Sequence, residues 1–321
     1  MGPSNPAHAQ PSAKPHRIDV HHHLSPPGYI TEIVKAKVAS RPTLDWTPAR
    51  GIEDMDRAGV ASAMTSITTP AVSFLTGADA RRMARECNEY GARLAIDHPG
   101  RFGVFAALPV PDIDGCLAEI AYGLDTLKAD GIALLTSYGT KWLGDPSLWP
   151  ILDELNRRRA LVYTHPTTAD CCRNLIPSVP DVTIEFGTDT TRAIASLLFS
   201  GAARKFPDIR WIFSHAGGTM PFLAERFIRM PLLDPALKPL LPDGVEVELK
   251  RFYYDTAQAA NPMALSALLK LIPISQVVFG TDVPFRTSID NVKGLGAFGF
   301  NPADLSAIER DNAARLLPRF A

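Results

Sequence analysis

Eight short runs rich in β-branched and aromatic residues recur along the chain, and a longer amphipathic segment separates each run from the next. This alternation is typical of consecutive βα units around a parallel sheet. The predicted strands are Arg17 to Val20, Val60 to Ile67, Phe102 to Leu108, Gly131 to Thr136, Ala160 to Thr164, Arg210 to Ser214, Arg251 to Thr256 and Gln276 to Thr281. The predicted helices are Gly51 to Ala58, Ala78 to Asp97, Ile113 to Lys128, Leu148 to Arg158, Thr190 to Lys205, Pro221 to Met230, Pro262 to Leu271 and Pro302 to Leu317. Eight such units favour one closed (β/α)8 TIM barrel over residues 17 to 321.

An open, doubly wound sheet is the alternative interpretation of the same alternation. A nucleotide-binding sheet of that kind carries a Gly-x-Gly-x-x-Gly turn after its first strand, whereas this first strand ends in histidines. Two connections, Leu24 to Pro48 and Thr168 to Gly187, are longer than ordinary βα loops. Both follow the carboxyl ends of predicted strands, which is where barrels build their sites.

The charge balance and the hydrophobic pattern exclude several classes of partner. The chain has 33 basic and 34 acidic residues, a formal net charge of -1, and no basic block that would attract nucleic acid or an anionic membrane. Its apolar runs fall far short of the roughly 20 residues that a membrane-spanning helix needs. Four irregularly spaced cysteines do not suggest a disulfide framework, and we interpret them as reduced thiols. A small molecule is therefore the expected partner.

The first sixteen residues, rich in Pro, Ser and Ala, are predicted to form a disordered leader. Ala7-His8-Ala9 resembles the cleavage site of an export signal, but the apolar segment that such a signal needs does not precede it. We expect a cytoplasmic protein, with a periplasmic location as the alternative if an export signal was removed.

Histidines and one aspartate stand at the ends of four predicted strands. In Asp19-Val20-His21-His22-His23-Leu24, residues two apart face the same side of a strand, so His21 and His23 point together while His22 points away. The other strand ends carry His165, His215 and Asp282. A surface loop or a tag fragment would also explain three consecutive histidines, and each remaining residue alone could be structural. Together, on one face of one barrel, they predict a metal centre.

Imidazoles and a carboxylate suit Zn²⁺ and other divalent first-row ions, and such a set leaves positions open for water or substrate. The predicted centre is therefore catalytic rather than structural.

The motifs at these strand ends resemble those of a known family. They are His-x-His after the first strand, His-Pro after the fifth, Ser-His-Ala-Gly-Gly after the sixth and Gly-Thr-Asp-x-Pro-Phe after the eighth. The chain resembles, from about residue 17 to 317, the amidohydrolase-related family typified by aminocarboxymuconate-semialdehyde decarboxylase, with γ-resorcylate and other hydroxybenzoate decarboxylases as relatives. The resemblance extends to segments away from the motifs, such as residues 52–60 and 195–202.

The resemblance implies roles for these residues. His21, His23, His165 and Asp282 would be the metal ligands, and His215 would be a catalytic histidine beside them. Zinc is the expected ion, with manganese as the alternative. Family members form dimers, which implies a homodimer here. Binuclear members carry a bridging lysine at the end of the fourth strand, and this strand has none, so we expect a single ion.

Substrate contacts are less well determined by sequence. Family decarboxylases hold the substrate carboxylate with an arginine after the first strand, and Arg41 occupies a comparable place, with a surface arginine as the alternative. Tyr138, Trp142 and Phe285 would favour a planar ring if they face the site, although each could equally be packing.

Two reactions fit the predicted centre. The leading hypothesis is non-oxidative decarboxylation of an aromatic or unsaturated carboxylic acid, with Asp282 as proton carrier and His215 either orienting it or activating metal-bound water. The alternative is hydrolysis of an amide or lactone, in which Asp282 takes a proton from metal-bound water and His215 stabilises the oxyanion. A non-catalytic metal-binding barrel is a third, weaker hypothesis, because the set of side chains is complete.

Overall fold

A computed structural model describes residues 15–321 of the chain. The predicted disordered leader lies outside the described residues except for Pro15 and His16. His16 joins the folded region: its backbone N–H donates to the carbonyl of Gly59, and its ring lies 2.8 Å from a carboxylate oxygen of Glu309. The start of the described chain is therefore tied to a segment close to its end.

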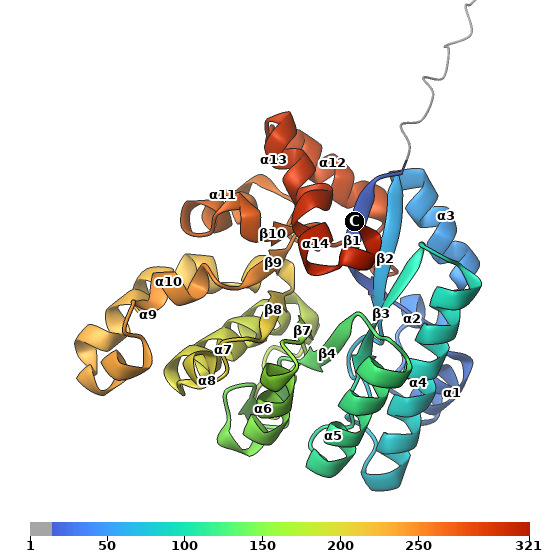
Figure 1. The fold of residues 1–321 in the computed structure, drawn as a ribbon, viewed down its shortest axis with the longest axis horizontal. Helices are drawn as coiled ribbons and strands as arrows, with labels where there is room; N and C mark the ends of the chain where they lie inside the picture. The colour runs from blue at the N-terminus through green and yellow to red at the C-terminus, as the bar shows by residue number, and fades with distance from the viewer. Residues whose placement is uncertain (1–14) are drawn as a thin grey trace, which may run out of the picture.

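Eight parallel strands form a nearly closed barrel, in agreement with the predicted fold (Figure 1). In barrel order they are β1 (Arg17–His23), β2 (Val60–Ser66), β3 (Phe102–Ala107), β4 (Gly131–Leu135), β7 (Leu161–His165), β8 (Arg210–Phe213), β9 (Tyr253–Asp255) and β10 (Val277–Val278). The two ends of this sheet meet, because the Val20 N–H donates to the Phe279 carbonyl at 2.9 Å and His22 bridges to Val283. All eight predicted strands are present, each within a few residues of its expected bounds.

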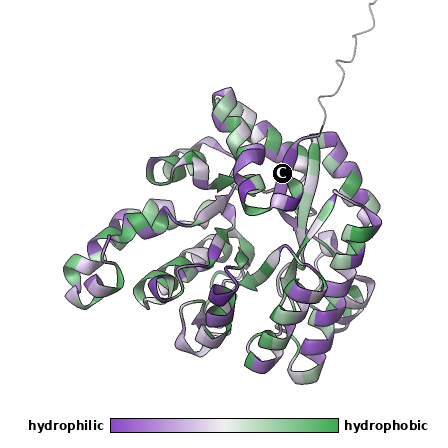
Figure 2. Cartoon of the chain, in the orientation of Figure 1, coloured by the Kyte–Doolittle hydropathy of each residue, from purple (hydrophilic) through white to green (hydrophobic). Residues whose placement is uncertain are grey.

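Helices surround the strands on the outside of the barrel, except for α14 (Asn312–Leu316) at the chain end, which lies across one end of the barrel (Figure 1). They are α1 (Pro27–Lys35), α2 (Arg41–Asp45), α3 (Pro48–Ala58), α4 (Gly77–Asp97), α5 (Ile113–Ala121), α6 (Trp149–Arg157), α7 (Glu185–Phe199), α8 (Ala202–Lys205), α9 (Met220–Leu233), α10 (Val245–Leu249), α11 (Pro262–Leu271), α12 (Ser288–Phe298), α13 (Pro302–Ser306) and α14 (Asn312–Leu316). Hydrophobic and hydrophilic residues mix along these helices, as expected when one helix face packs on a sheet (Figure 2). No helix in residues 15–321 is long and apolar enough to cross a membrane.

The core has two separate parts. The larger part fills the space between the strands and the outer helices. The smaller part fills the inside of the barrel, where Phe105 and Tyr163 stack with ring centroids 5.5 Å apart and α14 contributes Ala313 and Leu316 from the chain end. Side chains and α14 thus close the barrel at the amino ends of the strands, which leaves the carboxyl ends of the strands for a site.

The helical prediction differs from the structure in the connections. The long stretch after β1 was expected to be a loop, but it contains α1 and α2, because Pro27 and Pro42 each occupy the first turn of a helix, where a missing N–H costs nothing. The predicted helix from Thr190 to Lys205 begins at Glu185 and breaks at Gly201, whose φ of 81° only glycine adopts easily. A short hairpin of β5 (Ser137–Tyr138) and β6 (Lys141–Trp142) follows β4 and was not predicted.

Candidate metal centre

Three histidines and one aspartate meet at the carboxyl ends of the strands. His21 and His23 lie on β1, His165 ends β7, and Asp282 follows β10. One candidate ligand atom from each lies within 4.8 Å of all the others, and all four residues are buried. The structure therefore brings together the four side chains that the sequence predicted as ligands.

A buried aspartate fixes the neighbouring strands that carry this cluster. One carboxylate oxygen of Asp19 accepts from the backbone N–H groups of His21 and Thr281, at 2.9 and 3.0 Å. The other accepts from the Thr281 hydroxyl at 2.6 Å. Residues far apart in sequence, His21 and Asp282, are held side by side in this way, and the Asp282 N–H donates to the His21 carbonyl at 2.8 Å.

His22 points away from the cluster, as its position on the strand predicted. Its Nδ1 lies 3.3 Å from Asp19, and its Nε2 faces the indole N–H of Trp46 at 3.4 Å. Only the first and third histidines of the run therefore face the centre.

Each histidine of the cluster has an acceptor next to its Nδ1. The Nδ1 of His21 donates to Asp255 Oδ2 at 2.8 Å, that of His165 donates to the Pro166 carbonyl at 2.8 Å, and that of His23 lies 3.3 Å from the Ser66 carbonyl. Because carbonyl and carboxylate oxygens only accept, each Nδ1 carries a proton and each Nε2 faces the centre. Histidine ligands of metals in proteins are oriented in this manner. The cluster passes this test of its fit to a divalent ion.

Sequence reasoning missed Asp255, which supports the cluster from β9. Its side chain is fully buried. While Oδ2 accepts from His21, Oδ1 accepts from the backbone N–H groups of His215 and Ala257 at 2.8 and 3.0 Å. The sequence did contain a signal for Asp255, because it falls at the end of the predicted seventh strand. Other predicted strands carry their histidines at the same end.

The two oxygens of the Asp282 carboxylate have different surroundings. Oδ1 lies 3.1 Å from His23 Nε2 and 3.2 Å from His21 Nε2. Oδ2 accepts from the side-chain amide of Gln258 at 2.7 Å and lies 3.5 Å from His215 Nε2. Asp282 has a φ of 69°, a left-handed conformation that is uncommon for a residue other than glycine. Such a backbone at a cluster of this kind is typical of a functional site.

The charges of the cluster favour an ion. Burial disfavours the imidazolium form of His21, but the carboxylates of Asp255 and Asp282 outweigh burial and raise its pKa to about 10. Burial lowers the pKa of His23, and it lowers the pKa of His165 further, so both are neutral imidazoles at pH 7. Burial would raise the pKa of Asp282, yet the adjacent His21 holds it well below its usual range. An ion would therefore meet one carboxylate and two free lone pairs, and would displace one proton.

His215 lies beside the cluster rather than in it. Its ring stacks on that of His21, with centroids 5.1 Å apart, and its backbone is left-handed with a φ of 54°. Its Nε2 is buried, and among residues 15–321 it has no hydrogen-bond partner. A buried nitrogen without a partner is costly, and this one lies 3.5 Å from Asp282 Oδ2.

The predicted substrate contact, Arg41, does not touch the cluster. It begins α2, its side chain is 84% exposed, and its guanidinium pairs with Asp45 at 2.7 Å. It lines a surface cavity of about 350 Å³ together with Val283 and Arg286, which follow Asp282 in the chain. Its role in binding substrate stays a prediction.

Of the predicted aromatic residues, only Phe285 packs on the cluster. Its ring centroid lies 5.8 Å from that of His23, and the residue is 37% exposed. The Tyr138 hydroxyl accepts from the Leu135 N–H, and Trp142 donates to Asp189, so these two rings serve the packing of the hairpin. Sequence reasoning missed Phe186 on α7, whose ring lies 6.0 Å from that of His165. Two partly exposed rings, Phe186 and Phe285, thus pack against histidines of the centre.

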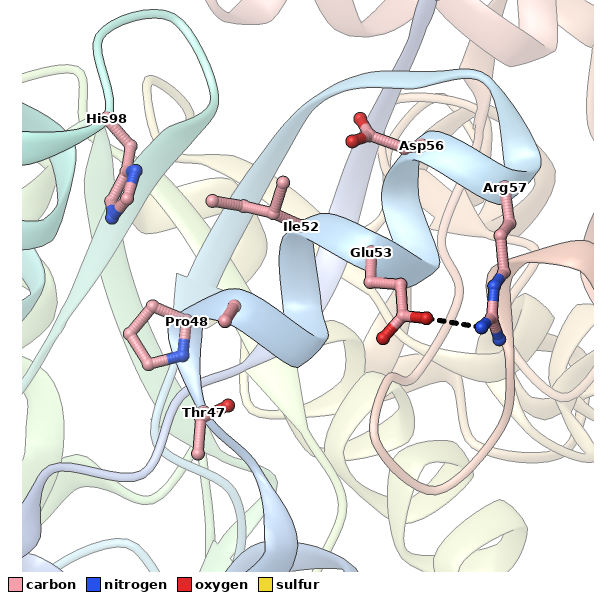
Figure 3. A pocket seen from close by; sticks show the side chains of 8 residues that line it. Thr47, Pro48, Ile52, Glu53, Asp56, Arg57 and His98 are labelled. Carbon is pink, nitrogen blue, oxygen red and sulfur yellow. Dashed lines mark hydrogen bonds and ion pairs between the residues drawn. The ribbon is translucent and has the colours of Figure 1, made fainter.

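A larger cavity lies elsewhere on the molecule (Figure 3). It measures about 770 Å³ and is lined by Thr47, Pro48, Ala49, Ile52, Glu53, Asp56, Arg57 and His98. Glu53 and Arg57 pair with each other, and Asp56 pairs with Arg101, so its charged groups are already satisfied. It contains none of the clustered residues, and we place the site at the metal centre.

Comparison with known proteins agrees with this geometry. The model of the amidohydrolase family matches residues 18–319. The chain belongs to the amidohydrolase family. It is 37% identical to the decarboxylase yanB of Aspergillus niger, over 95% of this chain and 88% of that protein. It is 34% identical to the 6-methylsalicylic acid decarboxylase of Penicillium expansum, over 84% of this chain and 85% of that protein.

Solved structures of other proteins share the fold of this amidohydrolase. An amidohydrolase II superimposes with a TM-score of 0.85 and 28% identity, over 94% of this chain and 99% of that chain. A 2,6-dihydroxybenzoate decarboxylase in complex with 2,6-dihydroxybenzoate gives 0.82 at 21% identity, over 94% and 99%. A 5-carboxyvanillate decarboxylase of Novosphingobium aromaticivorans with bound manganese gives 0.83 at 20% identity, over 94% and 96%. Together with the curated relatives, the family confirms the prediction of a carboxy-lyase of the amidohydrolase superfamily.

Proposed function

We propose that this amidohydrolase removes the carboxyl group of a monocyclic 2-hydroxybenzoate of the 6-methylsalicylic acid type, using one divalent ion. Two relatives that carry this substrate in their names are 34% and 35% identical over 84% of the chain. The observation that carries the proposal is that the two oxygens of the Asp282 carboxylate face different groups. Oδ1 faces the imidazoles of β1, and Oδ2 faces His215. One residue can then both complete a metal centre and exchange a proton beside it.

His21, His23, His165 and Asp282 would hold the ion, and zinc and manganese are the two candidates. When bound, the ion would supply a Lewis acid that binds oxygens of the substrate and stabilises negative charge on them. The neutral imidazoles of His23 and His165 and the Nδ1 hydrogen bonds of all three histidines orient the lone pairs for that purpose.

Asp282 would deliver a proton to the ring carbon that bears the carboxyl group. A carboxyl whose pKa is held low is a strong acid once it has picked up a proton, and protonation of an aromatic carbon requires a strong acid. The added proton interrupts the ring conjugation, the bond to the carboxylate breaks, and its electron pair returns to the ring as CO₂ leaves. The reaction consumes one proton and one arene carboxylate, and it yields one arene and one CO₂.

His215 and the two phenylalanines would complete the site. The Nε2 of His215 lies 3.5 Å from Asp282 Oδ2, close enough to orient that carboxyl group and to exchange a proton with it through a small shift. Phe186 and Phe285 would pack against the substrate ring, because aromatic walls favour planar ligands.

The direct test is to load the protein with zinc or manganese and supply 6-methylsalicylic acid, with lactones and aryl amides as competing substrates. We expect 3-methylphenol and CO₂, and in D₂O we expect deuterium at the ring carbon that lost the carboxyl group. Asp282→Asn should abolish turnover, because its amide cannot carry the proton. Hydrolysis of a lactone or amide with every acid left intact would overturn the proposal.

We further propose that the protein works as a homodimer. Phe222, Leu232 and Leu233 of α9 are 87%, 71% and 70% exposed, and exposed apolar side chains gathered on one element are typical of an interaction surface. Light scattering after size exclusion should give twice the chain mass of 34.9 kDa, and Phe222→Asp should shift the protein toward monomer. A monomer at micromolar concentration would refute this.

A further inference from the structure

Gln258 reaches the metal centre from the turn that follows β9. Its backbone is left-handed, with a φ of 56°. The turn is held by the Asp255 carboxylate, which accepts from the Ala257 N–H at 3.0 Å, and by the Ala259 N–H, which donates to the Thr256 carbonyl at 3.0 Å. A residue that is not glycine pays for this conformation only when the surroundings enforce it. The result is that the Gln258 amide extends over Asp282.

Two contacts fix the orientation of the Gln258 amide. Its nitrogen donates to Asp282 Oδ2 at 2.7 Å, and its oxygen accepts from the Nε of Arg286 at 3.0 Å. A guanidinium only donates and an ionised carboxylate only accepts, so turning the amide over would break both bonds. Arg286 therefore determines which end of Gln258 meets Asp282.

Arg286 belongs to the same turn as Asp282. The backbone N–H groups of Phe285 and Arg286 both donate to the Asp282 carbonyl, at 2.8 and 3.2 Å. The chain of contacts thus runs from the Asp282 carboxylate through Gln258 to Arg286 and back to Asp282 through the backbone. It joins the loop after β9 to the loop after β10.

We propose that Gln258 and Arg286 form a positioning pair that sets the rotation of the Asp282 carboxylate. The amide bond holds Oδ2 and thereby keeps Oδ1 facing the imidazoles of His21 and His23. The hydrogen bonds that join these two residues to the cluster all lead to Asp282, so both act through Asp282. This inference rests on the proposed decarboxylation only where kcat and KM are measured. The measurements of Zn²⁺ affinity and of the Mn²⁺ spectrum described below need no substrate.

Without Gln258, the Oδ2 atom would lose its 2.7 Å hydrogen bond and keep the longer 3.5 Å contact with His215. The carboxylate could then rotate about its last side-chain bond, whose torsion is broad for aspartate. Rotation would carry Oδ1 away from the imidazoles and would misplace the proton that Asp282 delivers. Replacement of a group that orients a metal ligand usually costs 10–100-fold in metal affinity or activity.

The test compares Gln258→Leu with Gln276→Leu, a matched change of the glutamine whose amide donates to the Lys250 carbonyl far from the cluster. We expect Gln258→Leu to lower kcat by roughly 10–100-fold with KM within about threefold. It should also weaken Zn²⁺ binding and broaden the electron paramagnetic resonance spectrum of bound Mn²⁺. Gln276→Leu should match the wild type in all of these. A Gln258→Leu protein with wild-type kcat, Zn²⁺ affinity and Mn²⁺ spectrum would overturn the proposal.

A double-mutant cycle tests whether Arg286 acts through Gln258. Arg286→Met should give a smaller loss of kcat than Gln258→Leu, and Arg286→Lys should recover most of it by donating to the same amide oxygen. The double variant Gln258→Leu/Arg286→Met should be no worse than Gln258→Leu alone, because contacting groups are not additive. Additive losses, or a rise in KM confined to Arg286→Met, would overturn the pair in favour of an independent arginine. A wild-type protein that decarboxylates nothing would refute the proposed function, while the Zn²⁺ and Mn²⁺ readouts would still decide this inference.

Discussion

Replacement of Asp255 by asparagine should weaken metal binding without removing any ligand. The aspartate is fully buried and uses one oxygen for His21 and the other for two backbone N–H groups, those of His215 and Ala257. An asparagine of the same shape has one oxygen and one NH₂ group for these three partners. Either His21 or the two backbone N–H groups must therefore face the NH₂ donor of the asparagine where they had a carboxylate oxygen as acceptor.

The cost of each orientation decides which one Asp255→Asn adopts. With NH₂ toward the backbone, two buried N–H groups lose their acceptor, at about 1–3 kcal/mol each. With NH₂ toward His21, only the imidazole must adapt, by giving up its Nδ1 proton and keeping the proton on Nε2. The second orientation is favoured, and it directs an N–H at the centre, where His23 Nε2 and Asp282 Oδ1 lie 3.2 Å away.

An imidazole with its proton on Nε2 cannot bind a metal through that atom. We expect Asp255→Asn to lose 10–100-fold in Zn²⁺ affinity, or about 1.4–2.7 kcal/mol, the usual cost of removing a carboxylate behind a histidine ligand. Competition against a chromophoric chelator at pH 7.5 measures this directly. Asp189→Asn is the matched control, since Asp189 is a buried aspartate bonded to Thr136, Ser137 and Trp142 and not to the cluster. Zn²⁺ affinity within twofold of wild type in a folded Asp255→Asn protein would refute this reasoning.

The remaining predictions concern the protonation of His21, the stability of the fold and the aromatic residue Phe186. Because the pKa of His21 is about 10 before an ion binds, Zn²⁺ affinity should rise about tenfold per pH unit between pH 6.5 and 9. Calorimetry in two buffers should show that one proton is released per Zn²⁺ bound, and binding without proton release would contradict this prediction. By the same shift, the stability that the His21 charge contributes is complete below pH 6.5 and is lost as pH rises through about 10. Asn88→Leu should lower the free energy of unfolding by about 2–4 kcal/mol in urea titrations, since Asn88 pairs with both the N–H and the carbonyl of buried Ala107; a loss below 1 kcal/mol would contradict this. Phe186→Ala should raise KM for the aromatic acid at least threefold with Zn²⁺ affinity unchanged, whereas an unchanged KM would remove Phe186 from the substrate wall.

The sequence predicted the parts of this fold that depend on regular patterns. Alternation of strand and helix patterns gave the barrel, and the alternation of side chains along β1 separated His21 and His23 from His22. His165 and Asp282 were found because they stand at strand ends, and parallel strands bring their carboxyl ends to one face. Those positions follow from periodicity and topology alone.

The missed residues depend on the paths of loops and on local turns. Gln258 reaches Asp282 only through a left-handed turn, and Phe186 reaches His165 only because α7 begins at Glu185, five residues before the predicted start. No periodic pattern encodes either position. Arg41 is a residue of this kind whose role stays a prediction: its place in the sequence resembles that of a family arginine, and on α2 its side chain is exposed and pairs with Asp45. Residues on loops are therefore the ones for which sequence position is the poorest guide.

The apolar interior of the barrel beneath the cluster determines which substitutions can alter catalysis. Beneath the cluster, Tyr163 packs on His21 with ring centroids 5.2 Å apart, and below it the interior is apolar down to α14. A substrate would thus approach from the carboxyl ends of the strands, where Phe186 and Phe285 pack against histidines of the centre. Asp255 and Gln258 lie on this same side, one behind His21 and one over Asp282. Substitutions in the apolar interior of the barrel should therefore change the free energy of unfolding. Substitutions in the turns after β9 and β10 should instead change metal affinity and proton delivery, with little effect on folding.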